Sequence, residues 1–175
     1  MKQAVQHFDD LRFQVSKTLL TLSDWVRWDI EEEKSSLIQS ELNKLLKEIE
    51  ETKALLKLVS DSLRYNPIGY KNVDDLQNYQ EQIHDFDLVG SYFIPTVQTI
   101  KDWKNTRQMN SDLQNLWANQ LEILGQYFQT RNNLVGKTQP GNRLMNNIPE
   151  ELETHKFQVY LYVVTEQLIK KLFQK

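Results

Sequence analysis

The chain of 175 residues contains no cysteine, and it has only five glycines and four prolines. Without cysteine there is no disulfide framework, no thiol nucleophile and no zinc site built on cysteine ligands. Glycine and proline are the residues that interrupt helices most strongly. Neither occurs before Pro67, so the first 66 residues can be helical throughout. These shortages favour a helical protein in a reducing compartment, and we expect a cytoplasmic location.

Long apolar runs and basic stretches are missing as well. No segment approaches the roughly 18 apolar residues of a membrane-spanning helix, and the first residues lack the apolar core of a signal peptide. The net charge is −3, and the lysines of residues 44–57 alternate with glutamates, so there is no basic stripe for nucleic acid. We therefore expect neither a membrane span nor general nucleic-acid binding.

Catalytic signatures are absent too. The chain has no glycine-rich phosphate-binding loop, no His-Glu-x-x-His helix and no Gly-x-Ser-x-Gly turn. We expect no cofactor, and we lean towards a protein that is not an enzyme.

Apolar residues recur at three- and four-residue steps along the first 66 residues, which predicts amphipathic helices. Two helices are expected, over residues 3–31 and 36–65, with one uninterrupted helix as the alternative. Their apolar faces consist of Phe8, Leu11, Val15, Leu19, Leu22 and Val26, and of Ile38, Leu42, Leu45, Ile49, Leu56, Val59 and Leu63. The second stripe is close to a heptad repeat. Region 1–66 is therefore either a long helical hairpin within a bundle or a coiled-coil-like part that pairs with a partner chain.

Shorter helices are expected to complete the bundle over residues 67–175, with glycine and proline at their boundaries. A helix is predicted to begin at Asn72, whose side chain can cap it, and to stop near Gly90. Another helix is predicted to begin at Pro95, because proline is well suited to the first turn of a helix.

Two more helices are predicted towards the end of the chain. One begins at Ser111 and ends at Gly136, a natural C-terminal cap. A loop over residues 137–148 follows, and the last helix begins at Pro149. The β-branched and aromatic residues 160–164 of that helix would also suit a strand, but the Pro-Glu-Glu start favours a helix.

These patterns together predict a single domain, residues 1–175, of the all-α class. The expected architecture is a helical bundle of five to six helices with long antiparallel N-terminal helices.

The three histidines raise the question of a metal site. Glu81 and His84 have Glu-x-x-His spacing, which is similar to that of the ligand-bearing helices in ferritin-like di-iron proteins. Such a site needs a second motif of this kind, and His155 is preceded three positions earlier by Leu152 instead of an acid. The favoured interpretation is that the histidines are solvated or cap helices. A metal site built on Glu81, His84 and His155 is kept as an alternative.

The first helix carries a second line of apolar residues. At about 100° per residue, Phe13 and Leu20 lie opposite Val15, and Trp28 lies close to them. Two apolar lines mean either that the helix is sandwiched within its own domain or that it presents a patch to a partner. Tryptophan with a neighbouring arginine, here Arg27, is typical of interface hot spots. We predict Phe13, Leu20, Arg27 and Trp28 as partner-binding residues.

The functional hypothesis is a non-catalytic helical module for protein–protein interaction, either an adaptor or a homo-oligomeric assembly protein. One alternative is a helical-bundle enzyme that depends on a metal or binds a small ligand. Another is a helical neutraliser, such as an immunity or inhibitor protein, of a toxin or nuclease.

Overall fold

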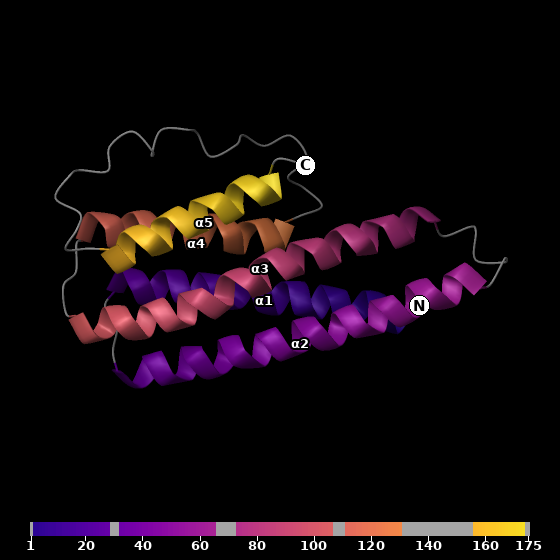
Figure 1. Cartoon of the computed structure of the whole chain (residues 1–175), viewed down its shortest axis with the longest axis horizontal. Helices are drawn as coiled ribbons and strands as arrows, with labels where there is room; N and C mark the ends of the chain where they lie inside the picture. The colour runs from indigo at the N-terminus through magenta and orange to yellow at the C-terminus, as the bar shows by residue number, and fades with distance from the viewer. Residues whose placement is uncertain (1, 29–31, 66–72, 107–110, 131–155, 174–175) are drawn as a thin grey trace.

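The computed structural model describes residues 2–28, 32–65, 73–106, 111–130 and 156–173, and all of them are helical. They form five helices, which are α1 (Lys2–Trp28), α2 (Glu32–Tyr65), α3 (Val73–Thr106), α4 (Ser111–Thr130) and α5 (Lys156–Phe173) (Figure 1). The described ranges contain no strand. The predicted all-α bundle is therefore confirmed. None of these five helices is both long and apolar enough to cross a membrane.

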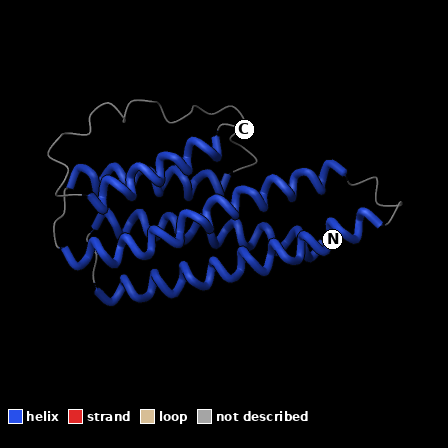
Figure 2. The backbone as a smooth tube through the Cα atoms, in the orientation of Figure 1, coloured by secondary structure: helices blue, strands red, loops and turns tan. Residues whose placement is uncertain are grey.

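The five described helices lie alongside one another (Figure 2), and their pairwise contacts close a ring around a shared core. Helix α1 lies between α2 and α4, α5 lies between α4 and α3, and the pairing of α2 with α3 closes the ring. Successive helices from α1 to α4 run in opposite directions (Figure 1). Helices α4 and α5 run in the same direction. Two contacts show this, since Trp117 forms a hydrogen bond with Thr165 and, further along both helices, Tyr127 packs on Phe173.

The helices of the ring differ in length. Helices α2 and α3 have 34 residues each, against 20 in α4 and 18 in α5. At 1.5 Å per residue, that is about 50 Å for α2 and α3 and about 30 Å for the short pair. The end of the α2–α3 hairpin therefore projects beyond α4 and α5 (Figure 1). Much of the surface of α2 consequently has no covering helix.

The two predicted apolar stripes of α1 and α2 form much of the core. Their described side chains are at most 5% exposed. Helix α1 ends at Trp28 and α2 begins at Glu32, so the prediction of two helices is confirmed and the single long helix is not observed. The near-heptad stripe of α2 packs against helices of its own chain, as in a bundle. The side chains of Val59 and Leu63 lie outside the described residues.

The predicted helix boundaries at Gly90 and Pro95 are wrong. Helix α3 runs without interruption from Val73 to Thr106 and contains both residues. Gly90 is buried against Leu46 and Ile49 of α2, and a Cβ atom at this position would meet only ordinary van der Waals contacts. Packing of α3 between α2 and α5 outweighs the poor helix propensity of glycine, which is about 1 kcal/mol below that of alanine.

Pro95 is tolerated because of where it lies in α3. Proline removes the hydrogen bond to the carbonyl group four residues earlier, which here belongs to Ser91. Ser91 is exposed and Pro95 is only half-buried, so this turn of α3 lies at the surface of the bundle. Two neighbouring threonines bond back to the helix, from Thr96 Oγ1 to the Tyr92 carbonyl oxygen (2.7 Å) and from Thr99 Oγ1 to the Pro95 carbonyl oxygen (2.8 Å).

Aromatic side chains from three helices pack against one another in the core. Phe86 of α3 stacks on Phe8 of α1 at 6.1 Å between ring centroids, and on Phe128 of α4 at 6.0 Å. Each such ring contributes about 1.5–3 kcal/mol by leaving water. This stack holds α1, α3 and α4 together across the bundle.

Near the C-terminus, residues 156–173 are helical, so the helical interpretation of residues 160–164 is confirmed. The predicted helix start at Pro149, the predicted cap at Gly136 and the loop over residues 137–148 lie outside the described residues.

Candidate interaction surface

Helices α1 and α4 approach each other along a seam of small residues. Ser16 and Ser23 are seven residues apart on α1, and Ala118 and Gly125 are seven apart on α4. Each serine hydroxyl donates a hydrogen bond to an α4 carbonyl oxygen, from Ser16 to Gly125 at 2.8 Å and from Ser23 to Ala118 at 2.7 Å. Because these side chains are small, the two backbones come close enough for the hydroxyl groups to reach. The seam fixes which side of α1 faces its own domain.

Two of the four predicted partner-binding residues lie at this seam. Leu20 is half-buried against Gly125, on the α4 side of α1. Arg27 donates hydrogen bonds to Asn119 Oδ1 at 3.0 Å and to Glu122 Oε2 at 2.9 Å. Both side chains therefore help to hold α1 on α4, as expected for a helix sandwiched within its own domain.

The other two predicted residues, Phe13 and Trp28, lie on the outer side of α1. The side chain of Phe13 is 63% exposed and that of Trp28 is 80% exposed. They are about 22 Å apart along the helix axis, and the exposed residues between them include Lys17 and Asp24. The four predicted residues thus do not form one continuous patch, although Phe13 and Trp28 are accessible. Their role in binding stays a prediction.

Sequence reasoning missed a second exposed surface, on α2. Its side turned away from the core carries four exposed residues at heptad spacing, Leu37, Lys44, Glu51 and Leu58. We call these four residues the α2 outer face. Leu37 is 60% exposed and Leu58 is 67% exposed, and Leu55 and Tyr65 are exposed nearby. The signal for this surface was present as a seven-residue spacing, but the stronger core stripe on the opposite side masked it.

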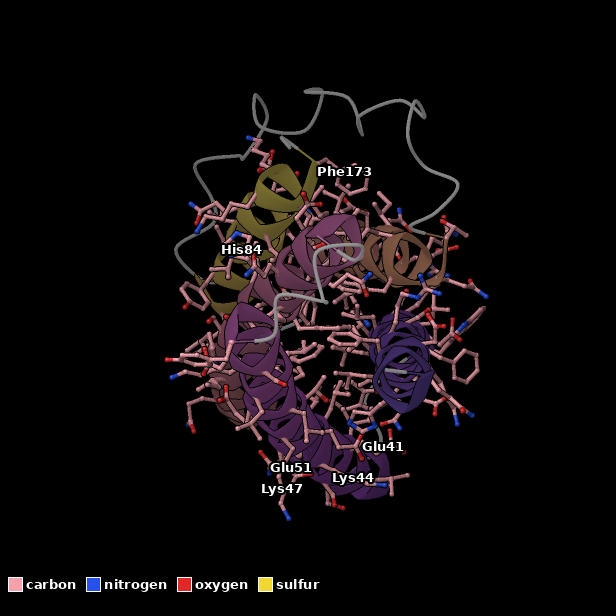
Figure 3. The ribbon with its side chains drawn as sticks, turned by 90° about the vertical axis from the view of Figure 1, so that its right-hand side faces the viewer. Glu41, Lys44, Lys47, Glu51, His84 and Phe173 are labelled. Atoms are coloured by element: carbon pink, nitrogen blue, oxygen red, sulfur yellow. The ribbon has the colours of Figure 1, made fainter. Side chains whose placement is uncertain are left out.

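The middle of the α2 outer face is charged. Lys44, Lys47 and Glu51 point away from the other helices (Figure 3). Lys44 lies 3.8 Å from Glu48, and Lys47 lies 3.6 Å from Glu51, both four residues along the same helix. Exposed pairs of this kind contribute only a few tenths of a kcal/mol each. These charges therefore remain available to a partner of complementary charge.

A groove of about 410 Å³ lies between α2 and α3 near the projecting end of the hairpin. Leu56, Ala54 and Ile83 form its apolar part, and Lys53 lies at its edge. The Lys53 ammonium group is paired with Asp87 of α3 and with Glu50, and these hydrogen bonds raise the pKa of Lys53 above its ordinary value. The groove is thus a shallow, mostly apolar surface beside an interhelical ion pair.

A polar cluster lies deep in the core, where α3, α4 and α5 meet. The Trp117 indole N–H donates to Thr165 Oγ1 at 3.0 Å and to the Tyr92 hydroxyl oxygen at 3.2 Å. The Tyr92 and Thr165 hydroxyl groups form a hydrogen bond with each other at 2.7 Å, and the Thr165 hydroxyl group also donates a hydrogen bond to the Leu161 carbonyl oxygen at 2.6 Å. Burial raises the pKa of Tyr92, and its hydrogen bonds partly oppose that rise. The cluster is fully enclosed, so it joins three helices without offering a substrate any access.

The residues of the metal-site alternative are only partly described. Glu81 and His84 are exposed on α3, one turn apart (Figure 3 shows His84). His155 lies outside the described residues. Within the described ranges, no three histidine, aspartate or glutamate side chains lie close enough together to hold a metal ion.

Comparison with known protein families, with curated proteins and with solved structures finds no match for this chain.

Proposed function

We propose that the protein is a non-catalytic helical module for protein–protein interaction, acting as an adaptor or as a homo-oligomeric assembly protein. The outer sides of α1 and α2 form its partner surface. One observation carries the proposal. Eight large apolar side chains are exposed among the described residues, and six of them lie on these two neighbouring helices, namely Phe13, Trp28, Leu37, Leu55, Leu58 and Tyr65.

Exposed leucines scattered singly are normal on protein surfaces and need no explanation. This group differs in its arrangement, because its α2 members follow a helical repeat on a helix whose core face is already filled. Aromatic residues and leucines at repeat positions bury large areas when a partner helix covers them. The proposed contact residues are therefore Phe13 and Trp28 on α1 and the leucines of α2, while Leu20 and Arg27 position α1. A cytoplasmic location remains an expectation of the same proposal.

Two sets of surface variants test the proposal. One set combines Phe13→Ser with Trp28→Ser, and the other combines Leu37→Ser with Leu58→Ser. The matched control is Ile94→Ser, which replaces an equally exposed apolar residue on α3 (64% exposed). All these side chains lie outside the core, so circular dichroism is expected to show unchanged helicity.

The readouts are the molar mass from light scattering and affinity capture with identification of the bound proteins. We expect at least one of the two variant sets to lose self-association or a captured protein that the wild type and the Ile94→Ser control both retain. The proposal fails if the wild-type chain is monomeric and every variant captures the same proteins in the same amounts.

A further inference from the structure

The α2 outer face has an internal symmetry that points to a particular partner. Leu37 and Leu58 lie equally far from the midpoint of Lys47 and Glu48, in opposite directions along α2. Lys44 and Glu51 are likewise equally far from that midpoint. A twofold axis through this point would turn the face onto itself in a second chain, which is the requirement for an isologous interface.

Charge decides how two such faces can meet. In an antiparallel pair, Lys44 of each chain lies opposite Glu51 of the other, and Leu37 lies opposite Leu58 at both ends. A parallel pair would instead place Lys44 beside Lys44 and Glu51 beside Glu51. Like charges in direct opposition are strongly disfavoured at interfaces, whereas opposite charges fix the register. The face is thus complementary to itself in one orientation only.

We propose that the α2 outer face is a self-association surface, on which α2 of a second copy of this chain packs antiparallel. The proposal rests on the proposed function and specifies its partner. Apolar contacts at the two ends supply the attraction, from Leu37, Leu58 and Leu55, while the central ion pairs set the register. Leu55 then faces the small residue Ser40 of the other copy, which leaves room for its side chain.

The position of α2 in the fold permits this contact. Among the described helices, α2 has only α1 and α3 as neighbours, so its third side is open. It also lies along one edge of the bundle, away from α4 and α5 (Figure 1). The side chains of Lys44 and Lys47 are 76% and 78% exposed, and that of Glu51 is 59% exposed. A second α2 can therefore approach without any rearrangement of the ring.

A charge-reversal mixture tests the proposal with the whole chain. Lys44→Glu places glutamate at both central positions, and Glu51→Lys places lysine at both. Each variant alone opposes like charges across the interface, so its dimer dissociation constant should rise about tenfold or more relative to wild type. An equimolar mixture of the two variants opposes glutamate to lysine at every central position. It should therefore form a heterodimer, with a molar mass of twice the 20.8 kDa chain.

Mixing separates this contact from effects within one helix. Lys44→Glu removes the pair with Glu48, and Glu51→Lys removes the pair with Lys47, and neither intrahelical pair can be restored by another molecule. Association regained on mixing must therefore act between chains. Lys171→Glu on α5 reverses the charge of an exposed residue outside the proposed partner surface, and this variant should self-associate like the wild type.

Two outcomes would overturn the inference. The first is a wild-type chain that stays monomeric from micromolar to millimolar concentration, and the second is a wild-type dimer that both charge reversals leave intact. Neither outcome decides the proposed function, because the capture experiment with the Phe13 and Trp28 variants reports on binding of other proteins. If one of these outcomes is found and those variants lose a captured protein, the interaction module is supported and its partner is another protein, not a second copy.

Discussion

Gly125 is the position at which a single added methyl group should disturb the fold most clearly. A Cβ atom built there lies 2.7 Å from Leu20 Cγ and 2.8 Å from Leu20 Cδ2, well inside van der Waals contact. It also lies 3.3 Å from the Ser16 carbonyl oxygen. Cγ is close to the backbone of Leu20, so the leucine cannot escape by moving only its tip. Either Leu20 leaves its rotamer or α1 moves away from α4.

The expected magnitude follows from opposing contributions. Overpacking of this kind costs about 1–3 kcal/mol. Separation of the helices would also weaken the hydrogen bond from Ser16 to the Gly125 carbonyl oxygen, at about 0.5–1.5 kcal/mol. Alanine has a higher helix propensity than glycine, which stabilises the helix by about 1 kcal/mol. We therefore expect Gly125→Ala to lower the free energy of unfolding by about 2 kcal/mol, within a range of about 0.5–3.5 kcal/mol, and Tm by about 4–8 °C for a chain of this length.

Urea unfolding followed by circular dichroism measures this change, and Gly90→Ala is the matched control. Gly90 is also a buried glycine within a helix, but a Cβ atom there lies 3.5 Å from Leu46 and 3.9 Å from Ile49. We expect Gly90→Ala to be neutral or to stabilise by up to about 1 kcal/mol. The double variant Gly125→Ala with Leu20→Ala should recover part of the loss, because it removes the clashing atoms. Equal stability changes in the two glycine variants would refute the close approach of α1 and α4.

Three further predictions concern polar groups. Tyr92→Phe should lower the free energy of unfolding by about 1–2 kcal/mol in denaturant titrations, because the substitution removes a buried hydrogen-bonded hydroxyl group. The control Tyr160→Phe alters a partly exposed tyrosine and should change the free energy of unfolding by less than about 0.5 kcal/mol. Burial raises the pKa of Tyr92, and burial together with Glu166 raises the pKa of Tyr162, so the folded chain keeps these protons longer than the unfolded chain does. Ionisation of these two tyrosines should therefore leave the free energy of unfolding unchanged below pH 10.0, the ordinary pKa of tyrosine, and should lower it as the pH rises above that value. Unfolding titrations in which the stability rises above pH 10.0 would contradict the burial of these side chains. Arg27→Ala should cost about 1 kcal/mol of unfolding free energy, because its ion pair with Glu122 is partly exposed to solvent, and a much larger loss would show that the pair is essential to the fold.

Helical periodicity predicted the parts of the fold in which one period dominates. In α1 and α2 the apolar residues repeat without interruption, and the described members of both stripes are buried. The break between the two stripes correctly predicted two separate helices, and α2 begins at Glu32, a few residues earlier than expected. Boundaries are less predictable than stripes, because they depend on how many turns the neighbouring helices cover.

Local residue preferences failed where tertiary packing opposes them. Gly90 and Pro95 are helix breakers in isolation, yet α3 continues through both. The helix is held along its length by α2 and α5, a contribution that no short window of sequence contains. Pro95 is also only half-buried, and Ser91, one turn before it, is exposed.

The candidate site shows the same limit. Phe13 and Trp28 were predicted from the second apolar line of α1, and both are exposed, but that line could not reveal that Leu20 rests on Gly125. A glycine in the middle of α4 gives no signal that a neighbouring helix approaches it. The α2 outer face was missed because its four positions include two charges, so hydrophobic spacing alone does not reveal them. These four residues form a surface because α2 lies at the edge of the bundle, where no other described helix covers this side.

Sedimentation velocity of the wild-type chain beside the Leu37→Ser, Leu58→Ser double variant tests the central claim most directly. The claim is that the exposed apolar side chains of α2 bind a second copy of this chain. We predict that the wild-type mass rises with concentration towards twice 20.8 kDa, while the double variant stays at the mass of one chain over the same range. A wild-type chain and a double variant that sediment alike at every concentration would contradict it.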